Sequence, residues 1–96
     1  MDRDEILEES LRIIHRHLPR GEFKVYLFGS WAKGLADPAS DIDLAILGPQ
    51  PVDDRLWLRL KEEMGSIPTL RRIDVVDLNQ TDESFRTEVL SYARVL

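Results

Sequence analysis

The chain contains no cysteine. This absence excludes disulfide bonds, thiolate metal ligands and a cysteine nucleophile. The sequence also lacks an apolar run near the ~20 residues that a membrane-spanning helix needs. Its first five residues, Met-Asp-Arg-Asp-Glu, are unlike a secretory signal peptide. We therefore expect a cytoplasmic protein that does not associate with membranes.

Runs of basic residues are also missing. The chain has 13 Lys and Arg against 18 Asp and Glu, a formal net charge of −5, and its longest basic run is Arg71-Arg72. Proteins that bind long nucleic acids gain much of their affinity by neutralising phosphates with Lys and Arg. We therefore expect no long nucleic acid as a ligand of the chain by itself. A single nucleotide is compatible, because a bound metal ion can supply the positive charge.

The length of 96 residues is that of one modest domain, without room for a separate substrate-binding domain. Apolar periodicity predicts helices over about 3–18, 53–64 and 83–95, and a short helix after Gly29-Ser30 that ends at Gly34. Strands are predicted over about 23–28, 41–47 and 72–78. Residues 1–96 are thus expected to form a two-layer α/β domain with a small mixed sheet of about three strands and about four helices. The first two strands are joined by too short a connection for a full crossover, which favours antiparallel pairing.

Two of these helices carry further expectations. Asp2 and Glu5 have the spacing of a capping box at the start of the first helix. In the last helix, an apolar stripe that includes Tyr92 and Leu96 is expected to face the core.

Acidic residues on the second and third strands are the first candidates for chemistry. Asp41 and Asp43 are two positions apart, so they face the same side of a strand at a spacing of ~6.5–7 Å. Such carboxylates can converge on one Mg²⁺ or bind two ions ~3.5–4 Å apart. Asp74 lies among β-branched residues, where a carboxylate is costly unless it is paired or metal-bound. Asp77 is three positions further on, so the two side chains face opposite sides of a regular strand and cannot serve one site. Because Asp77 lies near the strand end, Asp74 is the predicted third carboxylate.

Gly29-Ser30 lies where a strand gives way to a helix. Exposed backbone N–H groups and the positive end of a helix suit a phosphate. Glycine lets the backbone approach a ligand closely, and the Ser30 hydroxyl can donate a hydrogen bond. Lys33, one turn further on, can reach the same phosphates.

Two alternatives are open for other residues near these motifs. Trp31 either borders the nucleotide or packs against the rest of the protein. Arg71 and Arg72 either pair with Asp74 or protect an exposed strand start.

The order of these motifs along the chain resembles the nucleotidyltransferase fold of the DNA polymerase beta superfamily. The motifs are Gly29-Ser30, then Asp41-x-Asp43, then Asp74 on a later strand. Within it, the segments Gly-Ser-Trp-Ala-Lys-Gly and Ser-Asp-Ile-Asp-Leu-Ala-Ile resemble the minimal nucleotidyltransferases, many of which are antitoxins beside a HEPN-type RNase toxin. Lys33 stands where members of that family often have arginine.

This resemblance implies specific roles. Asp41 and Asp43 would bind two Mg²⁺ ions, and Asp74 would be the third ligand and activate an acceptor hydroxyl. Gly29 and Ser30 would hold the triphosphate of ATP. The expected activity is Mg²⁺-dependent transfer of AMP from ATP to a hydroxyl of a partner protein, a HEPN-type toxin. Two alternatives stay open, namely an antitoxin that acts by binding alone and nucleotidyl transfer to a small molecule.

Overall fold

The computed structural model describes residues 1–96 and shows an α/β fold with a four-stranded sheet. In chain order the elements are α1 (Arg3–His17), β1 (Lys24–Phe28), α2 (Ser30–Lys33), β2 (Ile42–Leu47), α3 (Asp54–Gly65), β3 (Ile73–Asp77), the 3₁₀ helix η1 (Leu78–Gln80), α4 (Glu83–Tyr92) and β4 (Arg94–Val95).

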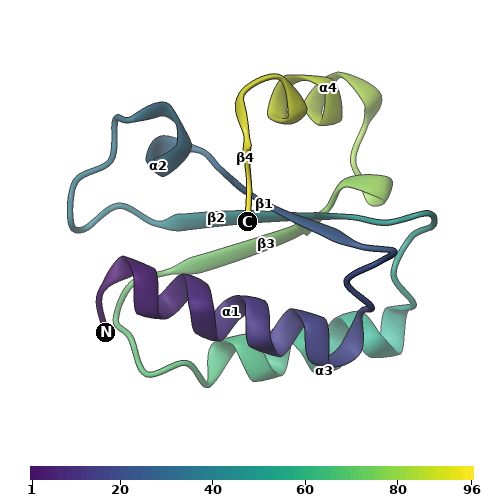
Figure 1. Ribbon diagram of the computed structural model, residues 1–96, viewed down its shortest axis with the longest axis horizontal. Helices are drawn as coiled ribbons and strands as arrows, with labels where there is room; N and C mark the ends of the chain where they lie inside the picture. The colour runs from purple at the N-terminus through teal and green to yellow at the C-terminus, as the bar shows by residue number, and fades with distance from the viewer.

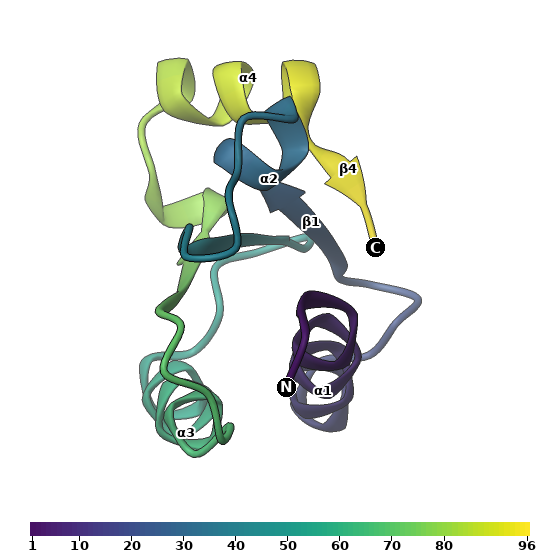
Figure 2. The same ribbon diagram turned by 90° about the vertical axis from the view of Figure 1, so that its left-hand side faces the viewer.

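The sheet is mixed, as predicted. Its strand order is β3-β2-β1-β4, with β1 antiparallel to both β2 and β4, and β2 parallel to β3. Helices α1 and α3 cover one face of the sheet, and α2 and α4 lie on the other (Figures 1 and 2). No helix has the length and apolar character required to cross a membrane.

The two faces of the sheet are covered unequally. A cluster of 16 buried residues fills the space between the sheet and the pair α1 and α3. On the other face, a cluster of 4 buried residues joins the sheet to α4, namely Phe28, Ala45, Leu78 and Val89. Each fully buried large aliphatic side chain contributes about 1.5–3 kcal/mol. Most of the hydrophobic stabilisation therefore comes from the face with α1 and α3, and the opposite face is left partly open.

Helix α1 begins with the predicted capping box. The Glu5 N–H donates to Asp2 Oδ1 at 2.9 Å, and the Asp2 N–H donates to Glu5 Oε1 at 3.3 Å. These two bonds satisfy N–H groups that have no partner within the helix. Asp53 and Asp82 cap α3 and α4 in the same way, by accepting hydrogen bonds from the first-turn N–H groups.

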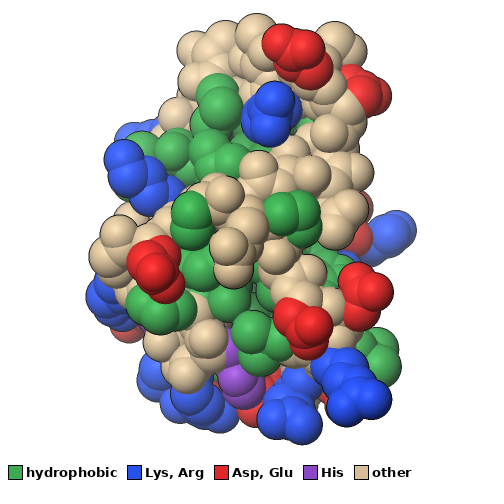
Figure 3. Space-filling view, turned by 90° about the vertical axis from the view of Figure 1, so that its right-hand side faces the viewer, with side chains coloured by type: hydrophobic (Ala, Val, Ile, Leu, Met, Phe, Trp, Pro, Cys, Tyr) green, Lys and Arg blue, Asp and Glu red, His purple; other side chains and the backbone are tan.

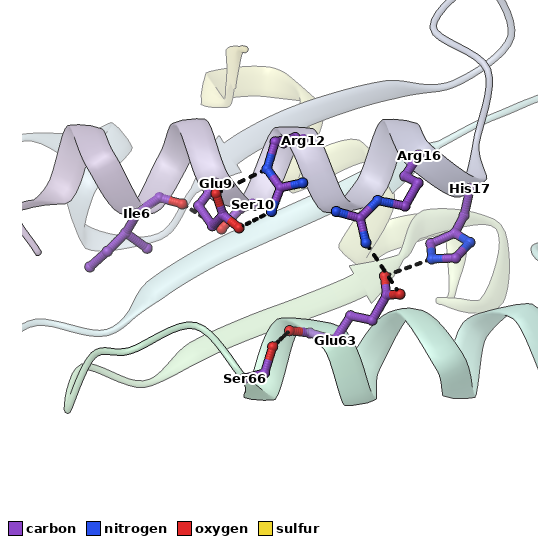
Figure 4. Close-up of polar contacts among 8 residues, drawn as sticks. All are labelled: Ile6, Glu9, Ser10, Arg12, Arg16, His17, Glu63 and Ser66. Carbon is purple, nitrogen blue, oxygen red and sulfur yellow. Dashed lines mark hydrogen bonds and ion pairs between the residues drawn. The ribbon is translucent and has the colours of Figure 1, made fainter.

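The C-terminal end of α1 is tied to α3 by a polar contact. His17 Nε2 lies 2.7 Å from Glu63 Oε2, and Arg16 Nη1 lies 3.5 Å from Glu63 Oε1 (Figure 4). His15 Nδ1 instead contacts the Leu18 carbonyl at the helix end, at 3.0 Å. In Figure 3, histidine appears among basic and acidic side chains at the end of the molecule formed by α1 and α3. His17 thus joins α1 to α3, and His15 contacts the C-terminal end of α1 itself.

The last helix is shorter than predicted, because the chain leaves it after Tyr92 and forms a fourth strand. Val95 pairs with Tyr26 of β1, and the Leu96 N–H donates to the Val25 carbonyl at 2.9 Å. The edge of β1 would otherwise keep unpaired backbone groups, and β4 satisfies some of them. The prediction that Leu96 continues the apolar stripe is therefore wrong, since Leu96 is exposed.

Candidate active site

The pairing register of the sheet places the acidic residues at one end of it. Asp43 in β2 lies opposite Phe28 of β1 and beside Asp74 of β3. Asp41 directly precedes β2, where the Ile42 N–H donates to the Arg72 carbonyl at 2.9 Å. Because side chains alternate along strands, Asp43 and Asp74 share the sheet face of Phe28, which α2 and α4 cover. The predicted neighbourhood of Asp43 and Asp74 is present.

The negative charge of these carboxylates exceeds the positive charge of the basic residue beside them. Burial raises the pKa of the half-buried Asp43 carboxyl, and the charges of Asp74 and Asp41 raise it further, partly opposed by Arg72. Arg72 Nε donates to Asp74 Oδ1 at 3.1 Å, which makes Arg72 the charge partner of Asp74. The one positive charge of Arg72 is thus set against the three negative charges of Asp41, Asp43 and Asp74, and this excess of negative charge favours a bound cation.

The donor atoms are all carboxylate oxygens, which are the ligands that Mg²⁺ prefers. No group of three or more histidine or acidic side chains is arranged to hold a metal ion by itself. Mg²⁺ is usually held in proteins by one or two carboxylates together with substrate phosphates. The residues present therefore fit a Mg²⁺ ion that binds together with a nucleotide, and the role of Asp74 as a third ligand stays a prediction.

Gly29 packs directly against Asp43. Its backbone has φ 70° and ψ −152°, a conformation that is essentially restricted to glycine. A Cβ atom added to Gly29 would lie 2.2 Å from Asp43 Oδ2. The missing side chain thus allows the carboxylate and the turn after β1 to lie in contact.

The turn after β1 differs from the sequence prediction in one respect. The Gly29 N–H was expected to be exposed, but it donates to the hydroxyl of Tyr92 in α4 at 3.0 Å. Helix α2 has 4 residues, too few for a substantial helix dipole. The features here that suit a phosphate are therefore the turn itself and the exposed side chains of Ser30 and Lys33, and their role in nucleotide binding stays a prediction. Sequence reasoning assigned Tyr92 to the core and missed this contact.

Trp31 fixes the loop that leads to Asp41. Its Nε1 donates to the Ser40 carbonyl at 3.3 Å. The guanidinium carbons of Arg3 and Arg71 lie 5.2 and 5.4 Å from its ring centroid. Arg71 Nη2 also donates to the Pro38 carbonyl at 2.7 Å. Trp31 therefore packs, as one of the two predicted alternatives states, and Arg71 stabilises the loop and not Asp74.

Asp77 has a structural role. Its carboxylate is buried and accepts hydrogen bonds from the Val52 N–H at 2.8 Å and the Asn79 N–H at 3.0 Å. These bonds satisfy a buried charge.

Comparison with known proteins identifies the family. The family model described as Polymerase beta, Nucleotidyltransferase matches residues 22–96, which include every candidate site residue. The chain belongs to this nucleotidyltransferase family. The predicted resemblance is thereby confirmed, and the enzyme class is nucleotidyltransferase.

The relatives of this nucleotidyltransferase include the probable protein adenylyltransferase MntA of Haemophilus influenzae. The two are 37% identical over 84 residues, which are 85% of this chain and 74% of the relative. A solved structure of a minimal nucleotidyltransferase has a TM-score of 0.62 and 27% identity, and the match covers 100% of this chain and 97% of that chain.

Two solved toxin–antitoxin complexes contain chains with the same fold. In a complex with AMP-PNP, the match has a TM-score of 0.72 at 24% identity and covers 92% of this chain and 69% of that chain. In a complex of a tri-AMPylated Shewanella oneidensis HEPN toxin with an MNT antitoxin, the match has a TM-score of 0.69 at 21% identity and covers 96% of this chain and 69% of that chain.

Proposed function

We propose that this nucleotidyltransferase moves AMP from ATP to a hydroxyl of a partner protein, and that the partner is a HEPN-type toxin which the chain silences as its antitoxin. The observation that carries the proposal is the register that sets Asp43 between Gly29 and Asp74. The 37% identity to the probable protein adenylyltransferase MntA supports AMP transfer to protein. The fold shared with chains of toxin–antitoxin complexes supports the choice of partner.

In this proposal Asp41 and Asp43 bind Mg²⁺, with two ions in the complete site. When bound, Mg²⁺ would supply the positive charge that offsets the charge on the triphosphate and on the leaving pyrophosphate. Gly29 and Ser30 hold the triphosphate by the backbone of the turn and the serine hydroxyl. Lys33, which is exposed and three residues further along the chain, adds a positive charge near the same phosphates.

Asp74 is the proposed base. One of its oxygens accepts a hydrogen bond from Arg72, which orients the carboxylate and leaves the second oxygen to accept a proton. The acceptor hydroxyl loses its proton to Asp74, and its oxygen forms a bond to the α-phosphorus. The bond from the α-phosphorus to the oxygen that leads to the β-phosphorus breaks, and pyrophosphate leaves.

The openness of the site favours a protein acceptor over a small molecule. Ser30, Lys33 and Asp41 are exposed. The surface has 5 hollows, and none of them is lined by Asp41, Asp43 or Asp74. Sites for small molecules usually bury most of the ligand surface. A macromolecular partner can supply the missing walls itself.

Labelled ATP tests this proposal. The chain and a HEPN-type toxin that binds it are incubated with Mg²⁺ and ATP labelled at the α- or the γ-phosphate. AMP transfer places only the α label on the partner, whereas arrival of the γ label would mean phosphoryl transfer. Asp43→Asn should abolish labelling, and the control Asp54→Asn, on the exposed first turn of α3, should keep it. Inhibition of the toxin without any label would favour an antitoxin that acts by binding alone.

A further inference from the structure

Tyr92 touches two of the three candidate nucleotide-binding residues. Its hydroxyl accepts the hydrogen bond of the Gly29 N–H at 3.0 Å. The ammonium nitrogen of Lys33 lies 4.6 Å from the centroid of its ring, a cation–π distance. The two contacts use different parts of one side chain, so they can be removed separately.

The position of Tyr92 is fixed from both sides along the chain. Before it, α4 is held on the sheet by the buried Val89 and by Phe85, whose ring meets Phe28 edge-on at 6.1 Å. After it, the Ala93 N–H donates to the Val89 carbonyl at 2.9 Å, and β4 pairs with β1. A side chain anchored in this way can hold a neighbouring turn in one conformation.

We propose that Tyr92 is a positioning residue for ATP in this site, an inference that rests on the proposed function. Its hydroxyl holds Gly29 in the conformation that lets the Asp43 carboxylate lie against the turn. Its ring holds the ammonium group of Lys33 beside the same turn.

Two substitutions separate the contacts. Tyr92→Phe removes the hydroxyl and keeps the ring beside Lys33, while Tyr92→Leu removes both. Tyr26→Phe is the matched control, because Tyr26 is half-buried against the same apolar cluster and its hydroxyl makes no hydrogen bond with the protein. The KM for ATP and the kcat of AMP transfer to the partner are measured for each variant, together with direct binding of Mg²⁺-ATP.

Tyr92→Phe should raise the KM and Kd for ATP about 2- to 10-fold, the usual effect of one lost hydrogen bond, with a smaller change in kcat. Tyr92→Leu should raise them further, and adding Lys33→Met to Tyr92→Leu should have less effect than Lys33→Met alone. Tyr26→Phe should match the wild type.

Equal ATP affinity in the wild type and both Tyr92 variants would overturn the role of Tyr92 and leave the proposed function intact. Loss of thermal stability in the Tyr92 variants with an unchanged KM would also overturn it, since the residue would then serve the fold alone. If the wild-type chain neither binds ATP nor transfers AMP, the proposed function and the role of Tyr92 fail together.

Discussion

Replacing Gly29 by alanine should damage both the fold and the site. The backbone conformation of Gly29 is essentially restricted to glycine, and forcing another residue into it costs about 1–3 kcal/mol. In addition, the new Cβ would lie 2.2 Å from Asp43 Oδ2, so the carboxylate or the turn must move. Overpacking of this kind typically costs a further ~1–3 kcal/mol. The expected total is about 2–6 kcal/mol, a large share of the ~5–15 kcal/mol that stabilises a typical protein.

Thermal unfolding followed by circular dichroism measures this loss. At ~4–8 °C per kcal/mol for a chain of this size, Gly29→Ala should lower the Tm by at least about 8 °C. Gly34→Ala is the matched control, because Gly34 also has a positive φ, 74°, but has no atom within 4 Å of an added Cβ. That variant should lose only ~1–2 kcal/mol, partly offset by a stiffer unfolded chain.

A double-mutant cycle isolates the contact with Asp43. Asp43→Ala removes the carboxylate that the new Cβ would meet, so the loss caused by Gly29→Ala should be smaller in that background. If the two losses add fully, or if Gly29→Ala and Gly34→Ala unfold at the same temperature, Gly29 does not pack against Asp43 as described.

Three further predictions follow from other contacts. Without metal, Asp43→Asn should be at least as stable as the wild type in thermal melts, because it removes one of three neighbouring negative charges; a clear loss of stability would contradict the repulsion described here. The hydrogen bond from His17, with the charges of His17, Arg16 and Arg59, lowers the pKa of Glu63 from its usual 4.5. The stabilisation from ionised Glu63 is therefore present above pH 4.5 and is lost as the pH falls through the lower folded-state pKa. Glu63→Gln should be less stable than the wild type at pH 7 and should approach its stability in acid. A stability difference that does not change with pH would contradict the ion pair of Glu63 with His17 and Arg16. Trp31→Leu should speed tryptic cleavage after Lys33 about 5- to 30-fold by loosening the loop that Trp31 holds, whereas Trp57→Leu, in α3, should not.

The parts of the fold that were predictable depend on contacts close in sequence. The capping box of α1 joins Asp2 and Glu5, three residues apart, and its spacing is visible in the sequence. The side-by-side placement of Asp43 and Asp74 was also predictable, because strand parity and the order of strands and helices limit how two acidic strand residues can meet.

The parts that were missed depend on distant contacts or very short elements. The hydrogen bond between Gly29 and Tyr92 joins residues 63 positions apart, and an apolar stripe on a helix looks the same whether a tyrosine meets the core or a turn. Strand β4 has 2 residues, too few to show alternation, and forms because β1 has a free edge. The pairing of Arg72 with Asp74 was not missed, because it was one of the two predicted alternatives, and residues two apart on a strand share a face.

The central claim is that Asp43 helps to bind a Mg²⁺-nucleotide complex beside the Gly29 turn. Isothermal titration of ATP into the wild type, Asp43→Asn and Asp54→Asn, with and without Mg²⁺, tests it most directly. We predict Mg²⁺-dependent binding by the wild type and by Asp54→Asn, and loss of that binding in Asp43→Asn. Equal binding by all three proteins, or binding that does not depend on Mg²⁺, would contradict the claim.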